Sequence, residues 1–241
     1  MPHDNDRPQP SSLRRPTSQT RRRIIPLQQG YLDCLCGVYA AINATALVLP
    51  KPPRGLHDKL FTVLLDTINA DEGIDVVIRE GIGFRLEADL LNAAGNYLHR
   101  RLGLALHSRP LFDPRHRLPI DQVFARIERV TTNGGVVIAG LLGRVRHWSV
   151  ITRLTDRSIF FHDSSGLTRL DRWRCRMDDE PPKTPKDYVL KPGGLFAVSM
   201  KETVAPVIPG VSAIRNSVGG TIAAAGEKAY PDTIPRHMLA A

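Results

Sequence analysis

The chain is poor in cysteine, in aromatic residues and in long apolar runs. Its three cysteines are too few and odd in number for a disulfide framework, which favours a reactive thiol instead. An aromatic content of 6% and the lack of a recognition motif argue against a nucleic-acid-binding protein. No apolar run approaches the ~20 residues of a membrane-spanning helix, and the polar, arginine-rich N-terminus lacks the apolar core of a signal peptide. We therefore expect a cytoplasmic protein without a membrane span.

The positive charge of the chain is concentrated near its N-terminus. The formal net charge is +9, and residues 1–23 alone carry six arginines against two aspartates. These residues are also rich in proline, serine and glutamine, a composition that favours a disordered basic arm. Such an arm could contact nucleic acid or an anionic membrane, but a solubilising tail is the favoured interpretation. Residues 205–241 are expected to form a flexible tail, which leaves residues 24–204 as one globular domain.

The order of hydrophobic patterns along residues 24–204 predicts an α+β fold. Residues 36–48 are almost wholly apolar and rich in alanine, which indicates a buried helix. Amphipathic spacing predicts further helices at 57–70, at 119–130 and at 86–104, the last interrupted at Gly95. Short segments rich in β-branched and aromatic residues predict strands at 134–143, 147–154, 158–165, 167–173 and 193–200. This order implies N-terminal helices packed on a C-terminal antiparallel sheet.

Cys36 stands where the buried helix is expected to begin. A thiol attacks as the thiolate, and the unpaired N–H groups of a helix N-terminus stabilise that negative charge. Gly37, the next residue, would let a substrate backbone approach the sulfur closely. Gln29, seven residues earlier, could donate one hydrogen bond to an oxyanion, and the Cys36 N–H a second. These features make Cys36 a candidate nucleophile.

A candidate base lies in the strand-rich half of the chain. His147 opens one expected strand, and Asp163 ends the next, sixteen residues later. Adjacent antiparallel strands would bring the two side chains together, so that Asp163 fixes the tautomer of His147 and supports its protonated form. His162 should point to the opposite face of its strand and is interpreted as structural. Cys36 and His147 would then form a nucleophile–base pair.

Three segments together resemble the papain-like cysteine peptidase superfamily: residues 29–44, 147–151 and 161–166. The similarity is greatest to a bacterial branch with a Cys-Gly-x-Tyr helix start, which shares features with bacteriocin-processing and Josephin-type peptidases. The resemblance implies a papain-like fold and no cofactor or metal. By position, it implies a catalytic set made of Gln29, Cys36, His147 and Asp163.

The spacing of the glutamine departs from the papain pattern. Gln29 is one residue further from Cys36 than is usual in papain, whereas Gln28 and Cys34 are separated by the usual six residues. We prefer Cys36 because Gly37 and the helix follow it. Cys34 with Gln28 stays open as the alternative pair, and the role of the second thiol is not fixed by the sequence.

The expected activity of residues 24–204 is that of a cysteine peptidase or isopeptidase, which hydrolyses an amide bond through a thioester on Cys36. Deamidation, transglutamination or another acyl transfer would use the same residues. A non-catalytic papain-like binding domain is a further alternative, which the intact Cys–His–Asp set argues against. A protein or peptide substrate is expected, and a ubiquitin-like protein is one such partner. The cluster at 172–176 could bind an acidic partner, but a strand edge protected by charge is favoured.

Overall fold

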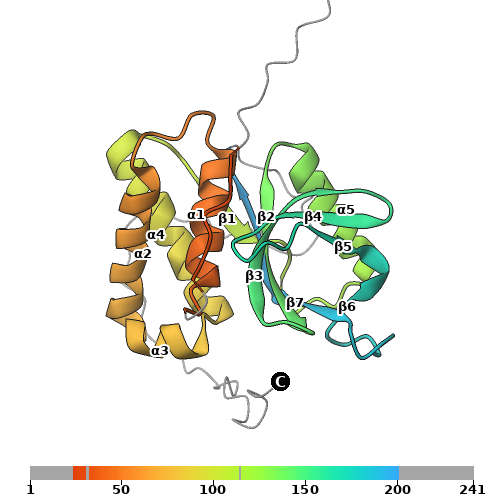
Figure 1. Cartoon of the computed structure of the whole chain (residues 1–241). Coiled ribbons are helices and arrows are strands. Elements are labelled where there is room, and N and C mark those ends of the chain that lie inside the picture. Colours follow the sequence, from red (N-terminus) through yellow and green to blue (C-terminus); the bar gives the residue numbers. More distant parts are fainter. Residues whose placement is uncertain (1–23, 31–32, 114, 201–241) are drawn as a thin grey trace, which may run out of the picture. The chain divides into compact units, whose positions relative to one another are not determined.

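The structure is a computed structural model that describes residues 24–30, 33–113 and 115–200 (Figure 1). All of these residues belong to the first of two units into which the chain divides, Met1–Thr203. The predicted basic arm at 1–23 and the predicted tail at 205–241 lie outside the described residues, so both stay predictions.

Five α-helices form within the described residues. The first is almost entirely buried, as its alanine-rich apolar sequence predicts. The fourth runs through Gly95 without a break, so the predicted interruption is wrong. A single glycine costs a helix only about 1 kcal/mol, and burial of a long apolar stripe outweighs that cost. The helices are α1 (Cys36–Val48), α2 (Leu56–Asp71), α3 (Ile74–Glu80), α4 (Phe84–Leu102) and α5 (Ile120–Thr132).

Seven strands of the described part of the chain form one sheet in the order β1-β7-β2-β3-β4-β5, and β6 also pairs with β7. β2, β3 and β4 are consecutive antiparallel neighbours, as predicted. The β6–β7 pair is parallel, so the expectation of a purely antiparallel sheet is corrected at this point. The strands are β1 (His107–Pro110), β2 (Val136–Gly143), β3 (His147–Leu154), β4 (Ser158–His162), β5 (Arg169–Asp171), β6 (Cys175–Met177) and β7 (Tyr188–Ser199).

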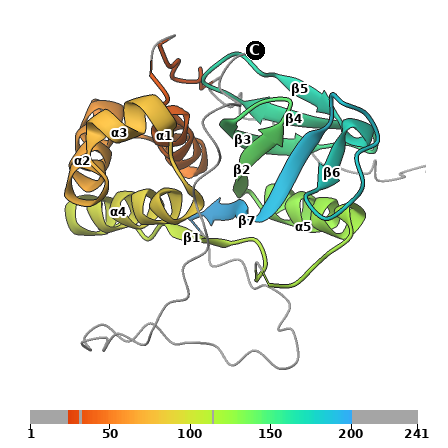
Figure 2. The ribbon, with the colours of Figure 1, turned by 90° about the horizontal axis from the view of Figure 1, so that it is seen from below.

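The two faces of the sheet are covered by different helices (Figure 2). Alternate side chains of a strand point to opposite faces. Val136 and Ile138 of β2 therefore pack with α1, α2 and α4. Val137 and Ala139 pack on the other face with α5. The expectation that N-terminal helices pack on the sheet is right for one face, and α5, from later in the chain, covers the other.

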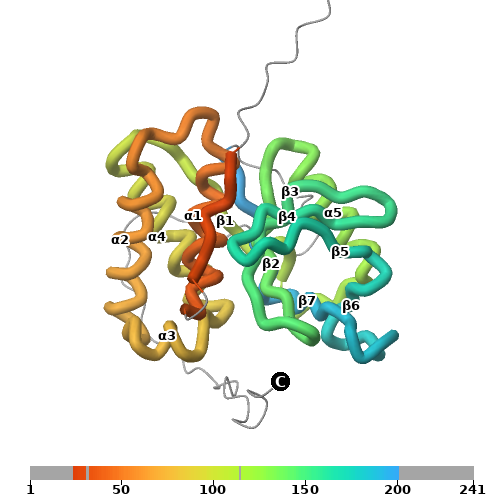
Figure 3. Tube along the Cα trace, in the orientation of Figure 1, coloured from red at the N-terminus to blue at the C-terminus, as the bar shows by residue number. Residues whose placement is uncertain are grey.

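α1 packs on the middle of the sheet, where it contacts β2, β3 and β7. Its first residue, Cys36, comes close enough to the start of β3 for the Trp148 N–H to donate a hydrogen bond to the Cys36 Sγ, at 3.4 Å. The segment before α1 runs beside the loop after β4 (Figure 3), where the Gln29 N–H donates to the Ser164 carbonyl at 3.1 Å. None of the described helices is both long and apolar enough to cross a membrane.

Candidate active site

Cys36 is held at the N-terminus of α1 with its sulfur turned toward β3. The side chain is buried, with 8% of the residue exposed. Asp33 orders the approach to the helix, because its Oδ1 accepts from the Leu35 N–H at 3.3 Å. The Trp148 N–H and the free N–H groups of the first helical turn supply partial positive charge around the sulfur. The sulfur therefore lies in a positive field at the start of the helix.

His147 and Asp163 are joined by a short hydrogen bond. His147 Nε2 lies 2.6 Å from Asp163 Oδ2, and the two side chains are 12% and 1% exposed. The second carboxylate oxygen, Oδ1, accepts from the backbone N–H groups of Ser165 at 2.8 Å and Leu167 at 2.9 Å. Burial alone would raise the pKa of Asp163, but the hydrogen bond with His147, its charge and the Leu167 N–H lower the pKa overall. Asp163 is therefore an anion fixed by the loop after β4.

Because Nε2 of His147 is bonded to Asp163, Nδ1 is the ring nitrogen that can exchange a proton with Cys36. Burial lowers the pKa of His147, but hydrogen bonds with Asp163 and Cys36, and their negative charges, outweigh it and raise the pKa from 6.5 to about 9. A ring with this pKa carries a proton at neutral pH. The arrangement can thus hold a thiolate–imidazolium pair, with Asp163 as the third member.

Gln28 and Gln29, the two candidate oxyanion donors, both form hydrogen bonds with the loop after β4. The Ser164 hydroxyl donates to Gln29 Oε1 at 3.1 Å. The Gln28 Nε2 donates to the carbonyls of Pro26 and Asp163, each at 3.3 Å. Because Oε1 of Gln29 faces Ser164, its Nε2 is the end that can donate to a substrate oxygen. No hydrogen bond between Gln29 and Cys36 occurs among the described residues, so the oxyanion role of Gln29 stays a prediction.

The Cys34 side chain contacts α3. It is exposed, and its Sγ donates to the carbonyl of Arg79, at the end of α3, at 3.7 Å. Partial burial, followed by the negative charges of Cys36 and Asp33, raises the pKa of the Cys34 thiol against the opposing charge of Arg146. A thiol with a raised pKa is a poor nucleophile at neutral pH. The geometry therefore favours Cys36 over Cys34 as the nucleophile.

Gly37 has a different role from the one expected. A side-chain carbon at this position would collide with Glu87 Oε2 and lie only 3.0 Å from Ile82 Cδ1. The space beside Gly37 is filled from the protein interior by Glu87 of α4 and by Ile82, two residues before that helix. Close packing of α1, rather than the approach of a substrate, accounts for the glycine.

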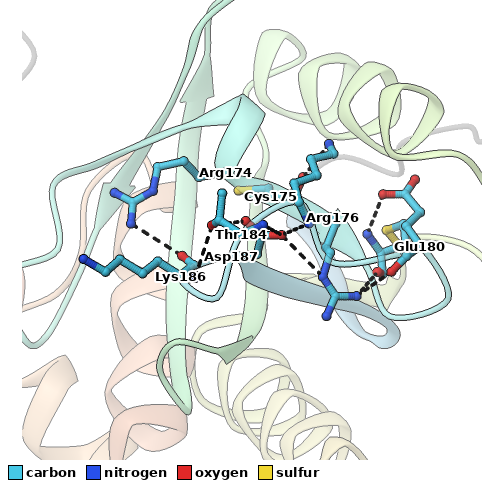
Figure 4. Close-up of polar contacts among 9 residues, drawn as sticks. Arg174, Cys175, Arg176, Glu180, Thr184, Lys186 and Asp187 are labelled. Carbon is cyan, nitrogen blue, oxygen red and sulfur yellow. Dashed lines mark hydrogen bonds and ion pairs between the residues drawn. The ribbon is translucent and has the colours of Figure 1, made fainter.

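Cys175 and the surrounding arginines are structural. Burial raises the pKa of the Cys175 thiol to about 12, so it stays protonated. Arg176 donates to the carbonyls of Met177 and Glu180 and lies 3.7 Å from a carboxylate oxygen of the buried Asp187 (Figure 4). Arg172 stacks on the ring of Phe124. The Arg176 contacts hold the segment between β6 and β7, and the Arg172 contact joins the residues before β6 to α5, which supports the structural interpretation of the cluster.

Glu87 is the residue beside this site that the sequence analysis missed. It is fully buried on α4. Helical spacing could have located it, because Glu87 falls three and four residues before Leu90 and Leu91 on the apolar stripe of the helix predicted at 86–104. An acidic residue on such a stripe indicates a special environment.

Within the described part of the chain, no group of three or more His, Cys, Asp or Glu side chains could hold a metal ion.

The comparisons with known proteins give no relatives. A scan against models of protein families, a search of curated proteins and a search of solved structures each found no match.

Proposed function

We propose that this protein is a cysteine hydrolase of the papain-like type, a peptidase or isopeptidase that cleaves an amide bond through a thioester on Cys36. The observation that supports the proposal is the convergence of Cys36, His147 and Asp163. They come from the start of a buried helix, the start of β3 and the loop after β4. His147 is hydrogen-bonded to Asp163, and the N–H of the next residue, Trp148, donates to the Cys36 Sγ. The α+β arrangement, with the nucleophile on a helix packed against the sheet that carries the base, agrees with this type.

The first half of the proposed reaction is acylation of Cys36. The thiolate attacks the carbonyl carbon, a C–S bond forms, and the carbonyl π electrons move to oxygen. The Cys36 N–H and the Gln29 Nε2 would donate to this oxyanion. The C–N bond then breaks, and the leaving nitrogen takes the proton from His147.

The second half is hydrolysis of the thioester. Neutral His147 accepts a proton from water, and the water oxygen attacks the thioester carbon. The C–S bond breaks and leaves a carboxylic acid, the thiolate and the imidazolium, which restores the starting state. Asp163 keeps the histidine ring oriented and lowers the free energy of its charged form in both halves.

The test uses the full chain and a peptide library that includes lysine-branched isopeptides, analysed by mass spectrometry. New peptide ends or released branches that depend on Cys36 support the proposal. Conversion of glutamine to glutamate, or new Lys–Gln bonds, would instead identify a deamidase or a transglutaminase on the same residues.

The controls are Cys36→Ala, which should abolish every product, and Cys34→Ala, which should keep them. A separate alkylation with iodoacetamide addresses the binding-domain alternative. If the library is unchanged and Cys36 reacts no faster than an unstructured thiol, the chain is no hydrolase and the binding domain takes its place.

A further inference from the structure

Glu87 is a carboxyl group buried without a hydrogen-bond partner among the described residues. Its exposed fraction is 0%, and neither Oε1 nor Oε2 is paired with another described side chain or backbone group. It is also the one glutamate of the described residues that is buried. Burying an unpaired carboxyl group is costly, and far more so when it is charged. A group retained at such a cost calls for an explanation.

The carboxyl group lies against the first turn of α1, directly beside the nucleophile. A side-chain carbon on Gly37 would overlap Glu87 Oε2, so the carboxyl fills the space next to the residue that follows Cys36. The free N–H groups of this turn create a positive field that stabilises an anion. A charged Glu87 and a Cys36 thiolate would therefore compete for the same field.

None of the described side chains donates a hydrogen bond to the Glu87 carboxyl group. Burial, followed by the negative charge of Cys36, raises the pKa of Glu87 well above its ordinary value. Beyond Cys36, the titratable groups on the elements that pack against α4 are Tyr39 of α1, His57, Asp58, Lys59, Asp66 and Asp71 of α2, His107 and Arg109 of β1, and Tyr188 and Lys191 of β7. Those of α4 itself are Arg85, Asp89, Tyr97, His99, Arg100 and Arg101.

We propose that Cys36 and Glu87 form a coupled acid pair that holds a single negative charge, carried by Cys36 in the active form while Glu87 keeps its proton. The inference rests on the proposed function and adds a positioning residue to it. Two neighbouring acids of like charge resist being ionised together. The neutral acid supports the first turn of α1 without repelling the thiolate.

The proton balance of the pair follows from the contacts. The thiol proton of Cys36 passes to His147, whose imidazolium offsets the thiolate, and Asp163 offsets part of the imidazolium charge. A proton lost from Glu87 would add a second anion beside Cys36 with no further cation. Cys36 would then be driven back to the neutral thiol, and the site would lose its nucleophile. The active form therefore requires that Glu87 stay protonated.

Infrared spectroscopy of the full chain tests the state of Glu87 directly. Protein labelled with carbon-13 at the glutamate side-chain carboxyl should show, at neutral pH, the shifted C=O stretch of a protonated acid. Because Glu87 is the buried glutamate of the described residues, the band should vanish in Glu87→Gln. It should stay in Glu80→Gln, which makes the same change at an exposed glutamate. No such band in the wild type would overturn the proposal.

The coupling is tested by removing the charge of the partner. In Cys36→Ser, which bears no thiolate, the pH at which the band disappears should fall by about one unit or more, as expected for close like charges. Cys34→Ser is the matched control, because Cys34 does not shift Glu87, and should leave that pH unchanged. An equal pH in the wild type and in Cys36→Ser would overturn the pair.

This comparison needs no folded Glu87 variant and no substrate. If the peptide library is not processed but the band responds to Cys36→Ser, the acid pair stands and the proposed hydrolysis fails. If the library is processed but the band is absent, the hydrolase stands and the pair fails. The two proposals can therefore be overturned separately.

Discussion

At the scale of single residues, the ion pair of His147 and Asp163 has the strongest electrostatic consequence. The Asp163 carboxylate is fixed beside Nε2 of the imidazole, and the pKa of His147 rises from 6.5 to about 9 despite burial. The folded protein therefore binds a proton on His147 that the unfolded chain releases at lower pH. A group of this kind links folding stability to pH.

His147 should make the protein less stable as the pH rises from about 6.5 to about 9. A histidine whose pKa is raised in the folded state stabilises fully below the unfolded pKa and loses its contribution as the pH passes the folded one. The rise of the His147 pKa from 6.5 to about 9 corresponds to a loss on the order of 3 kcal/mol at about 1.4 kcal/mol per pH unit. Asp163 acts with the opposite sign, since its pKa is lowered, and its share is lost only in acid, below 3.8.

Urea denaturation at a series of pH values measures this effect. The measurement is made in Cys36→Ser, because a Cys36 thiolate in the folded protein lacks a proton that the unfolded thiol keeps, which offsets the proton held by His147. In Cys36→Ser the free energy of unfolding should still decline across the window, by a smaller amount due to Asp163, and with His147→Gln added the window should be nearly flat. Adding His116→Gln instead is the control, because His116 is exposed and should leave the decline intact. Equal slopes with and without His147→Gln would contradict the raised pKa.

The two neighbouring thiols should differ in reactivity. The Cys36 Sγ accepts from the Trp148 N–H, and Cys36 is among the groups that raise the pKa of His147, whereas Cys34 contacts the Arg79 carbonyl and has a raised pKa. Cys36→Ala should remove turnover by several orders of magnitude, and Cys34→Ala should retain much of it. Peptide mapping after brief iodoacetamide treatment at neutral pH should find Cys36 labelled before Cys34. Faster labelling of Cys34 would transfer the nucleophile to that residue and make Gln28 its oxyanion donor.

At the scale of elements, the contact of α1 with α4 depends on Gly37. Alanine forms helices better than glycine by about 1 kcal/mol. At this position, however, the added carbon would overlap Glu87 Oε2 and crowd Ile82. Overpacking of a buried site costs about 1–3 kcal/mol. Gly37→Ala should therefore destabilise the protein overall, in spite of the gain in helix propensity.

Gly95→Ala is the matched substitution, because Gly95 also lies inside a helix. Its added carbon would meet the Leu106 carbonyl oxygen at 3.5 Å and the Leu106 Cβ at 3.8 Å, which are ordinary contacts. Gly95→Ala should raise the free energy of unfolding by about 0.5–1 kcal/mol. The urea midpoints of the two variants should therefore move in opposite directions, and a shift in the same direction would contradict the packing argument.

The elements that the sequence predicted are those with a long or clean pattern. The helix over 36–48 and the β2–β3–β4 meander are confirmed, because apolar runs and β-branched segments specify them locally. β1 and β6 were missed, because their four and three residues include no β-branched or aromatic side chain. Their pairing with β7 depends on contacts distant in sequence, which no local propensity encodes.

The candidate site was predictable in its members and not in its surroundings. Cys36, His147 and Asp163 could be chosen because helix starts and adjacent strand ends bring such residues together. The tie of Gln29 to Ser164 and the burial of Glu87 beside Gly37 arise from tertiary packing. The explanation of Gly37 by substrate approach was wrong for the same reason, because the group that excludes a side chain there comes from α4, fifty residues further along the chain.

At the scale of the whole molecule, the site exists only when both halves of the chain are assembled. Cys36 comes from α1 and His147 from β3. The hydrogen-bonded residues Cys36 and Trp148 are 112 positions apart in the sequence. α1 is held against the sheet by one hydrophobic core, and α5 closes the opposite face with a second core. Because each face of the sheet is covered within the described residues, this part of the chain has the layered architecture of a complete domain.

Residues 24–204 should therefore fold and keep a reactive Cys36 without the flanking segments. The residues of both cores found in the described part of the chain lie between Leu27 and Met200, and the composition of 1–23 and 205–241 cannot bury enough apolar surface to offset the entropy of ordering. A chain of residues 24–204 should have a thermal midpoint within a few degrees of the full chain and the same rate of Cys36 alkylation by iodoacetamide. Limited trypsin digestion of the full chain should likewise remove the arginine-rich start first and leave a fragment close to 24–204. A shortened chain that aggregates, unfolds at much lower temperature or loses the alkylation of Cys36 would mean that a flanking segment completes the fold or the site.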